Sequence, residues 1–298
     1  MIDLRYHITS IVAVFLALGL GVLIGSTIVG NNVLVDQQKK MIDSLDQQFY
    51  SLRERENDLV AEDNFKQTVI NNYENFSQTL QPLLLKDRLA NFKVAVVVSG
   101  DSEIPAGMLN ALSLSGASVV SNTVLLPGMS FGDASLREQV AKYYQMDAQS
   151  APDILRHRIA EDVAATIANS GDQTNLAMLQ KKNLVKYSGE TKTPADAVIL
   201  VGGVNNLANF FAQSFDQGLV DGLNQKGLRV FGVENSTANY SYMEEYQKNN
   251  ISTVDNIEMS PGQLSLIFSL AGEPGNYGVR TTAKKFMPSL PVHAIKGT

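Results

Sequence analysis

A run of twenty-two residues near the N-terminus, from Ile8 to Val29, carries no charge. As a helix it would extend about 33 Å, enough to cross the roughly 30 Å hydrocarbon core of a bilayer. A cleaved signal peptide would have a shorter apolar region, a more basic start than Arg5 alone, and small residues before a cleavage site. We therefore expect residues 1–30 to form a short cytoplasmic tail and an uncleaved transmembrane anchor.

Small residues recur every four positions in this run, at Ala13, Ala17, Gly21 and Gly25. Residues four apart share one side of a helix, and Gly21 to Gly25 is a GxxxG motif, which lets two membrane helices approach closely. Such residues are also common in membrane helices that do not pair. The hypothesis is that the stripe packs against a second helix, from another copy or from a partner membrane protein.

The charges on the two sides of the anchor nearly balance. Arg5 and the terminal amine precede it, and Lys39 and Lys40 follow it. The positive-inside rule therefore gives little preference. Because one N-terminal span before a long folded region is the usual signal-anchor arrangement, we expect a single-pass cell-membrane protein with residues 31–298 outside the cytoplasm.

Residues 31–90 show a heptad pattern that predicts a coiled-coil stalk. The expected seam is Leu45, Leu52, Leu59, Tyr73 and Leu80. A second line of positions, which includes Leu34, Met41, Val69, Phe76 and Leu83, turns polar in the middle at Gln48, Arg55 and Glu62. Polar seam residues fix register and partner choice, so we expect a homodimer or higher oligomer. The alternative is an amphipathic helix that folds back onto the C-terminal domain, and in either case Pro82 is expected to stop the helix.

Residues 91–298 alternate between strand and helix patterns. The apolar runs Val94–Val98 and Ala197–Val201 are continuous, which is typical of strands buried on both faces. Further strands are expected near 117–126 and 228–233, and helices near 105–115, 133–186, 207–226 and 254–279. This alternation predicts an α/β domain with a mostly parallel sheet between two helical layers.

Ligands of such sheets bind beyond the carboxyl ends of the strands, at a topological switch point. The candidates at these positions are Asp101, Gly202, Gly203 and Asn205. The same residue types are needed for tight strand-to-helix turns, so turn formation alone would also explain them. Neither segment matches a dinucleotide fingerprint or a P-loop.

The residues provide little for catalysis. The chain has no Cys and three histidines, His7, His157 and His293, and it lacks a G-x-S-x-G nucleophile elbow. No H-x-x-x-H pair or carboxylate-rich loop suggests a metal site, and the Met residues are scattered. The net charge of −6 argues against nucleic acid as a partner. We expect a protein that is not an enzyme, with no cofactor implied by its residues.

Three segments resemble the MctB-type family of copper transporters: the opening MIDLRYHITSIVAVFLALGLGVLIGS, the later VILVGG, and GNYGVRTTAKKFMPSLP. The resemblance implies a single-pass envelope protein that takes part in copper transport or homeostasis. Copper is implied by this resemblance alone and not by any residue pattern in the sequence. Related members are linked to cell-envelope assembly and septation alongside a second membrane protein. The residues alone favour an alternative, a non-enzymatic oligomeric scaffold that contacts a membrane partner through its stalk and head.

Overall fold

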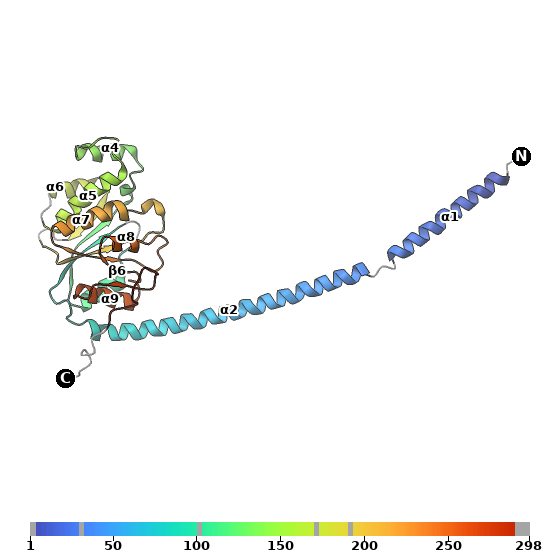
Figure 1. Cartoon of the computed structure of the whole chain (residues 1–298), viewed down its shortest axis with the longest axis horizontal. Helices are drawn as coiled ribbons and strands as arrows, with labels where there is room; N and C mark the ends of the chain where they lie inside the picture. Colours follow the sequence, from blue (N-terminus) through green and yellow to red (C-terminus); the bar gives the residue numbers. More distant parts are fainter. Residues whose placement is uncertain (1–3, 30–32, 100–102, 170–172, 190–192, 290–298) are drawn as a thin grey trace. The chain divides into compact units, whose positions relative to one another are not determined.

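The computed structural model describes residues 4–29, 33–99, 103–169, 173–189 and 193–289 (Figure 1). The chain forms two compact units, Met1–Asn71 and Asn72–Thr298. The described residues of the first unit are helical, and the second unit holds a sheet with helices on both faces.

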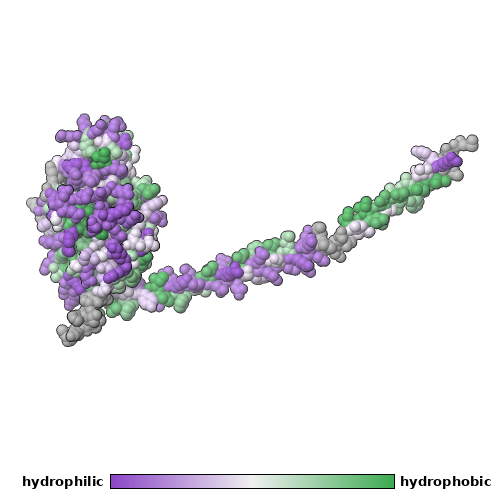
Figure 2. All heavy atoms as spheres, viewed as in Figure 1, coloured by the Kyte–Doolittle hydropathy of each residue, from purple (hydrophilic) through white to green (hydrophobic). Residues whose placement is uncertain are grey.

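Helix α1 spans Leu4–Val29, and its segment Arg5–Ile28 is long and apolar enough to cross a membrane. Its apolar side chains make a continuous green surface in Figure 2. The predicted membrane-length helix is therefore confirmed. A Cβ added at Gly21 or Gly25 would have no neighbour within 4 Å, so the small-residue stripe is open. Whether a second helix packs there stays a prediction.

Helix α2 spans Val33–Leu85, which fits the predicted stalk. The leucines of the expected seam, Leu45, Leu52 and Leu59, are all exposed in the single chain. The expectation that Pro82 stops the helix is wrong by one turn. Proline lacks only its own N–H, and its carbonyl still accepts a bond from the Lys86 amide at 3.2 Å.

The second unit contains a seven-stranded sheet with the order β3-β2-β1-β4-β5-β6-β7. The strands are β1 Lys93–Val98, β2 Ser118–Leu125, β3 Val185–Gly189, β4 Ala197–Val201, β5 Arg229–Val233, β6 Ser252–Val254 and β7 Asn276–Tyr277. All neighbours pair in parallel except β2 and β3. Strand β4 is buried along its whole length, and so is β1 after Lys93, which explains their unbroken apolar sequences.

Two helical layers cover this sheet and confirm the predicted α/β class (Figure 1). Helices on one face are α4 Ala134–Tyr143, α5 Pro152–Ile167, α6 Gln173–Lys181, α7 Gln217–Gln225 and α8 Met243–Lys248. On the other face lie α3 Ala106–Leu114, α9 Ser260–Leu270 and the end of α2 at Leu85. Each layer buries its own apolar core against the sheet.

Three expected helices differ from the structure. The segment expected to be helical over 133–186 holds three separate helices and reaches the edge strand β3. The segment 207–226 begins with a 3₁₀ turn, Leu207–Asn209, and a π-helical turn, Ala212–Asp216, before α7. The segment 254–279 contains only α9 and then β7, because Gly272 adopts a φ of +120° and ends the helical region. The short strands β3, β6 and β7 carry too few apolar residues to show a strand pattern.

The last turns of α2 belong to the second unit. Gln81 donates a buried hydrogen bond of 2.7 Å to Gln263 of α9. The carboxylate of Glu74 accepts from the backbone amide of Ser260 at 3.2 Å and from its hydroxyl at 2.5 Å, at the first residue of α9. An acidic group at that end also interacts favourably with the helix dipole. Leu85 is fully buried and completes the attachment.

Two of the three leucines of α3 provide a matched test of the core. Leu112 is 1% exposed and Leu109 is 39% exposed. We expect Leu112→Ala to lower the free energy of unfolding by about 2–4 kcal/mol because it leaves a cavity, and Leu109→Ala to lower it by less than about 1 kcal/mol. Urea unfolding followed by circular dichroism measures both, and equal losses would contradict the two-layer packing.

Candidate functional site

The topological switch point of the sheet lies between β1 and β4, because the chain passes from β1 to β2 on one side and continues at β4 on the other. Gly202 and Gly203 directly follow β4. A Cβ on Gly202 would lie 2.4 Å from Tyr246 Oη, and one on Gly203 would lie 2.9 Å from Ala238 Cβ. Gly203 also has a φ of +80°, which favours glycine. Both glycines therefore allow the segment after β4 to pack closely against other segments of the same chain.

The other two candidates at this edge have different outcomes. Asn205 accepts a hydrogen bond of 3.3 Å from the Asn239 amide, so it lies beside the segment that follows β5. Asp101 lies outside the described residues. The structure thus brings Gly202, Gly203 and Asn205 to one edge of the sheet. Nearby side chains of the same molecule fill the space around the two glycines.

A buried ion pair closes the same edge at the end of β5. Glu234 has a fully buried side chain, and its Oε1 lies 3.0 Å from Nε of Arg280. Its carboxylate also accepts from the Ser241 hydroxyl at 2.6 Å and from the Tyr242 amide at 2.9 Å. Burial raises the pKa of Glu234, and these donors together with the Arg280 charge oppose the rise.

Asp255, after β6, holds the backbone next to this arginine. Its carboxylate accepts from the amides of Val279 at 2.7 Å and Arg280 at 3.1 Å. The guanidinium of Arg280 donates in turn to the carbonyl of Ser236 at 2.9 Å. The GNYGVRTTAKKF segment, which includes Arg280, therefore fastens the carboxyl edge of the sheet.

A second buried carboxyl, Asp216, ends the π-helical turn. Its Oδ2 accepts a hydrogen bond of 2.8 Å from the hydroxyl of Tyr246. Burial raises the pKa of Asp216 to about 7, and the hydroxyl groups of Ser99 and Tyr246 moderate that rise. Sequence reasoning did not find this residue, because an Asp within an expected amphipathic helix is assigned to the solvent side.

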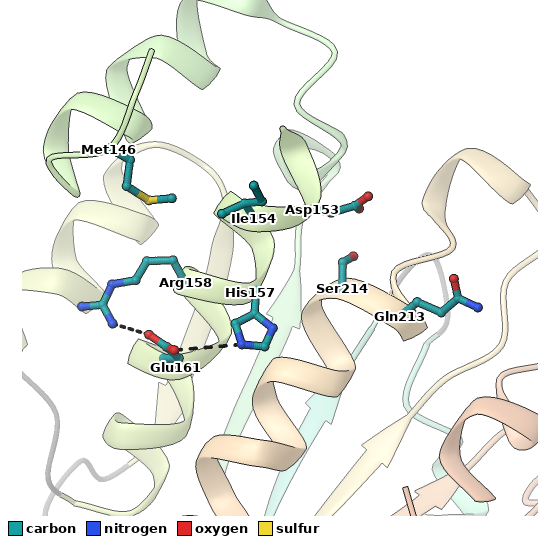
Figure 3. Close-up of a pocket in the computed structure, with 8 residues that line it drawn as sticks. All are labelled: Met146, Asp153, Ile154, His157, Arg158, Glu161, Gln213 and Ser214. Carbon is teal, nitrogen blue, oxygen red and sulfur yellow. Dashed lines mark hydrogen bonds and ion pairs between the residues drawn. The ribbon is translucent and has the colours of Figure 1, made fainter. Parts of the chain in front are cut away.

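An open cavity of about 420 Å³ lies over the outer side of α5 (Figure 3). Its lining residues are Met146, Asp153, Ile154, His157, Arg158, Glu161, Gln213 and Ser214. His157 and Arg158 reach Glu161 from its two sides, and Nε2 of His157 lies 4.0 Å from Glu161 Oε1. Sequence reasoning placed His157 as a helix residue but did not connect it with Met146, because the two lie eleven residues apart on different segments, and such a separation has no fixed geometry before the fold is known.

A neighbouring cavity of about 700 Å³ shares His157, Arg158 and Glu161 and extends along α7. Two glycines of α7 let the helices approach closely. A Cβ on Gly218 would lie 2.8 Å from Nδ1 of His157, and one on Gly222 would lie 2.8 Å from Cβ of Ala164. Because Nδ1 is pressed against α7, the imidazole presents its Nε2 edge toward Glu161.

Buried Arg156 anchors the wall between α5 and the π-helical turn. It donates to the Ser214 hydroxyl at 3.0 Å and to the Met129 carbonyl at 2.8 Å, and it stacks on the Phe211 ring at 4.7 Å. These contacts hold Ser214 at the rim of the cavity beside α5.

Potential metal donors are few. Among the described residues, no group of three His, Cys, Asp or Glu side chains is arranged to hold a metal ion. Met108, Met129 and Met243 are fully buried in the cores. Met146 and His157, by contrast, line the same cavity, so a thioether and an imidazole are both accessible there.

The structure defines a class of protein with an apolar membrane-length helix, a long exposed helix and an α/β head. A family model described as "Copper transport outer membrane protein, MctB" matches residues 1–288. The chain belongs to this MctB family, as the resemblance in its opening and closing segments predicts. Relatives named "Copper transporter MctB" from Mycobacterium bovis and Mycobacterium tuberculosis are 26% identical, over 93% of this chain and 96% of theirs.

The packing around Gly202 can be tested by adding one methyl group. We expect Gly202→Ala to lower the free energy of unfolding by about 2 kcal/mol or more, since the new Cβ would lie 2.4 Å from Tyr246 Oη. Gly132→Ala is the control, because its Cβ would meet nothing nearer than 3.8 Å. Urea unfolding compares them, and an unchanged Gly202→Ala variant would indicate open space at the switch point.

The raised pKa of Asp216 predicts a pH-dependent stability. Between about pH 4 and pH 7 the folded protein keeps a proton that the unfolded chain has lost, so the free energy of unfolding falls as pH rises through this window. The loss is at most about 4 kcal/mol, at about 1.4 kcal/mol per pKa unit.

Asp216→Asn keeps an acceptor for Tyr246 but cannot ionise. We expect its unfolding free energy to depend less on pH between 4 and 7.5 than that of the native protein, and to match or exceed it at pH 8. Urea titrations across this range measure the difference. Parallel pH profiles for the two proteins would show that Asp216 is not the titrating group.

Proposed function

We propose that this protein takes part in copper transport or homeostasis as a single-pass, membrane-anchored protein whose head lies outside the cytoplasm. The observation that carries the proposal is the family match over residues 1–288, which includes the apolar helix, the long helix and the head. Since one helix cannot enclose a pore, movement of copper across a bilayer would require several copies or a partner protein.

The α5 cavity is the place in the head where we propose that copper is contacted. Copper(I) favours thioether and imidazole ligands, and Met146 and His157 provide one of each. The 4.0 Å between His157 Nε2 and Glu161 Oε1 is too long for a hydrogen bond. A cation with bonds of about 2 Å to each atom would fit between them.

Two features of the cavity limit its affinity. Arg158 forms an ion pair with Glu161 and places a positive charge beside the proposed cation. Met146 must also turn toward His157, which the unbranched methionine side chain permits. We therefore propose exchangeable binding, as suits a cargo, and not a permanent metal centre.

Copper(I) titration of the full-length protein in detergent, against a chromophoric chelator, tests the proposal. We expect binding tighter than about micromolar, weakened at least about tenfold by His157→Gln and by Met146→Leu. Met259→Leu is the control, because Met259 is exposed elsewhere in the head.

Each result has a distinct meaning. No binding tighter than about micromolar in the native protein would overturn copper contact by this chain and favour the scaffold alternative. Binding that both cavity variants retain would overturn the cavity alone. Copper accumulation in cells that lack the protein, compared with cells that express it, tests the wider role independently.

A further inference from the structure

The last turns of α2, within the unit Asn72–Thr298, present two different sides. One side carries Glu74, Gln81 and Leu85, which attach it to the head through hydrogen bonds and core packing. Another side carries Tyr73, Phe76 and Leu83, which are 70%, 61% and 79% exposed, together with the half-buried Leu80. We name these four residues the head-end seam.

The head-end seam has the spacing of a coiled-coil interface. Its residues follow one another at intervals of three, four and three, so they form one apolar stripe along the helix. Side chains of this size are rarely left exposed as a contiguous group unless they mark an interaction surface. Attachment to the head leaves Tyr73, Phe76 and Leu83 exposed and covers only part of Leu80.

We propose that the head-end seam pairs with the same four residues of a second copy of this chain, in a parallel and in-register coiled coil. Two copies anchored through α1 in one membrane would begin their α2 helices on the same side of it, which favours a parallel pair over an antiparallel one. A symmetric pair then places each seam residue opposite its own equivalent. This interface goes beyond the proposed copper function and does not depend on it.

The residues beside the seam are compatible with a second copy. The flanking positions are Asn72, Ser77, Thr79 and Leu84, which carry no charge. Identical chains therefore bring no like charges together at this end of α2. A partner selected by charge would instead need charged residues at these flanking positions.

The N-terminal part of α2, in the first unit, also carries exposed apolar side chains. Leu45, Leu52 and Leu59 are exposed, and so are Ile42 and Phe49, which lie three residues before the first two of these leucines. In this half, Ile42 and Phe49 are further apolar positions beside the leucine line. The charged middle of α2 holds an ion pair of 2.7 Å between Glu62 and Lys66. In a pair of helices, each of these side chains can pair instead with the opposite charge on the other copy.

Cross-linking through introduced cysteines tests this proposal. Because the chain has no native Cys, each variant carries a single reactive thiol at a known position. Single-cysteine variants of the full-length protein, Tyr73→Cys, Phe76→Cys and Leu83→Cys, are treated in membranes with a short bis-maleimide. The controls are Asn75→Cys and Gln78→Cys, which are exposed in the same turns but on other sides of the helix. We expect covalent homodimers from the three seam positions, at several times the yield of the controls.

The outcomes separate the possible occupants. Equal yields at all five positions would indicate random collision and overturn the proposal, as would the absence of any dimer. A cross-linked product whose mass includes a different protein would replace the second copy with that partner. Phe76→Glu combined with Leu83→Glu should abolish the dimers formed through Tyr73→Cys. Copper binding, measured on the same variants, should stay unchanged, so failure of either proposal is recognised separately.

Discussion

Burial of the two central strands on both faces is the constraint on which the head depends. Strands β1 and β4 are almost entirely apolar, so water must be excluded above and below them. One covering layer comes from α4 to α8, and the other from α3, α9 and the end of α2. The second layer is completed by Leu85, so the last turn of α2 contributes to the core of the head.

The carboxyl edge of the sheet shows how a common ligand position can be used for structure. Tyrosine side chains lie against Gly202, and Arg280 neutralises the buried Glu234. A buried Glu234 carboxylate without a partner would carry a large desolvation penalty. The burial of Glu234 therefore depends on the charge of Arg280. Accessible polar groups also line the cavity along α5, where His157 and Glu161 are partly exposed.

Patterns that repeat along one element were predictable from the sequence. The apolar helix, the long helix and the strands Val94–Val98 and Ala197–Val201 follow from runs of similar residues, which need no knowledge of neighbours. The edge strand β3 and the short β6 and β7 were missed, because they are defined by pairing with strands distant in sequence. The α5 cavity combines Met146, His157 and Ser214 from separate elements, and the buried Asp216 depends on Tyr246, so neither has a local signal.

The pair between Glu234 and Arg280 also has a consequence for the order of events during biosynthesis. Glu234 leaves the ribosome well before Arg280, and until the arginine arrives the carboxylate cannot enter the interior without a penalty. Strands β6 and β7 also follow Glu234 in the sequence. The nascent head is therefore held short of its final packing until almost the whole chain has been synthesised.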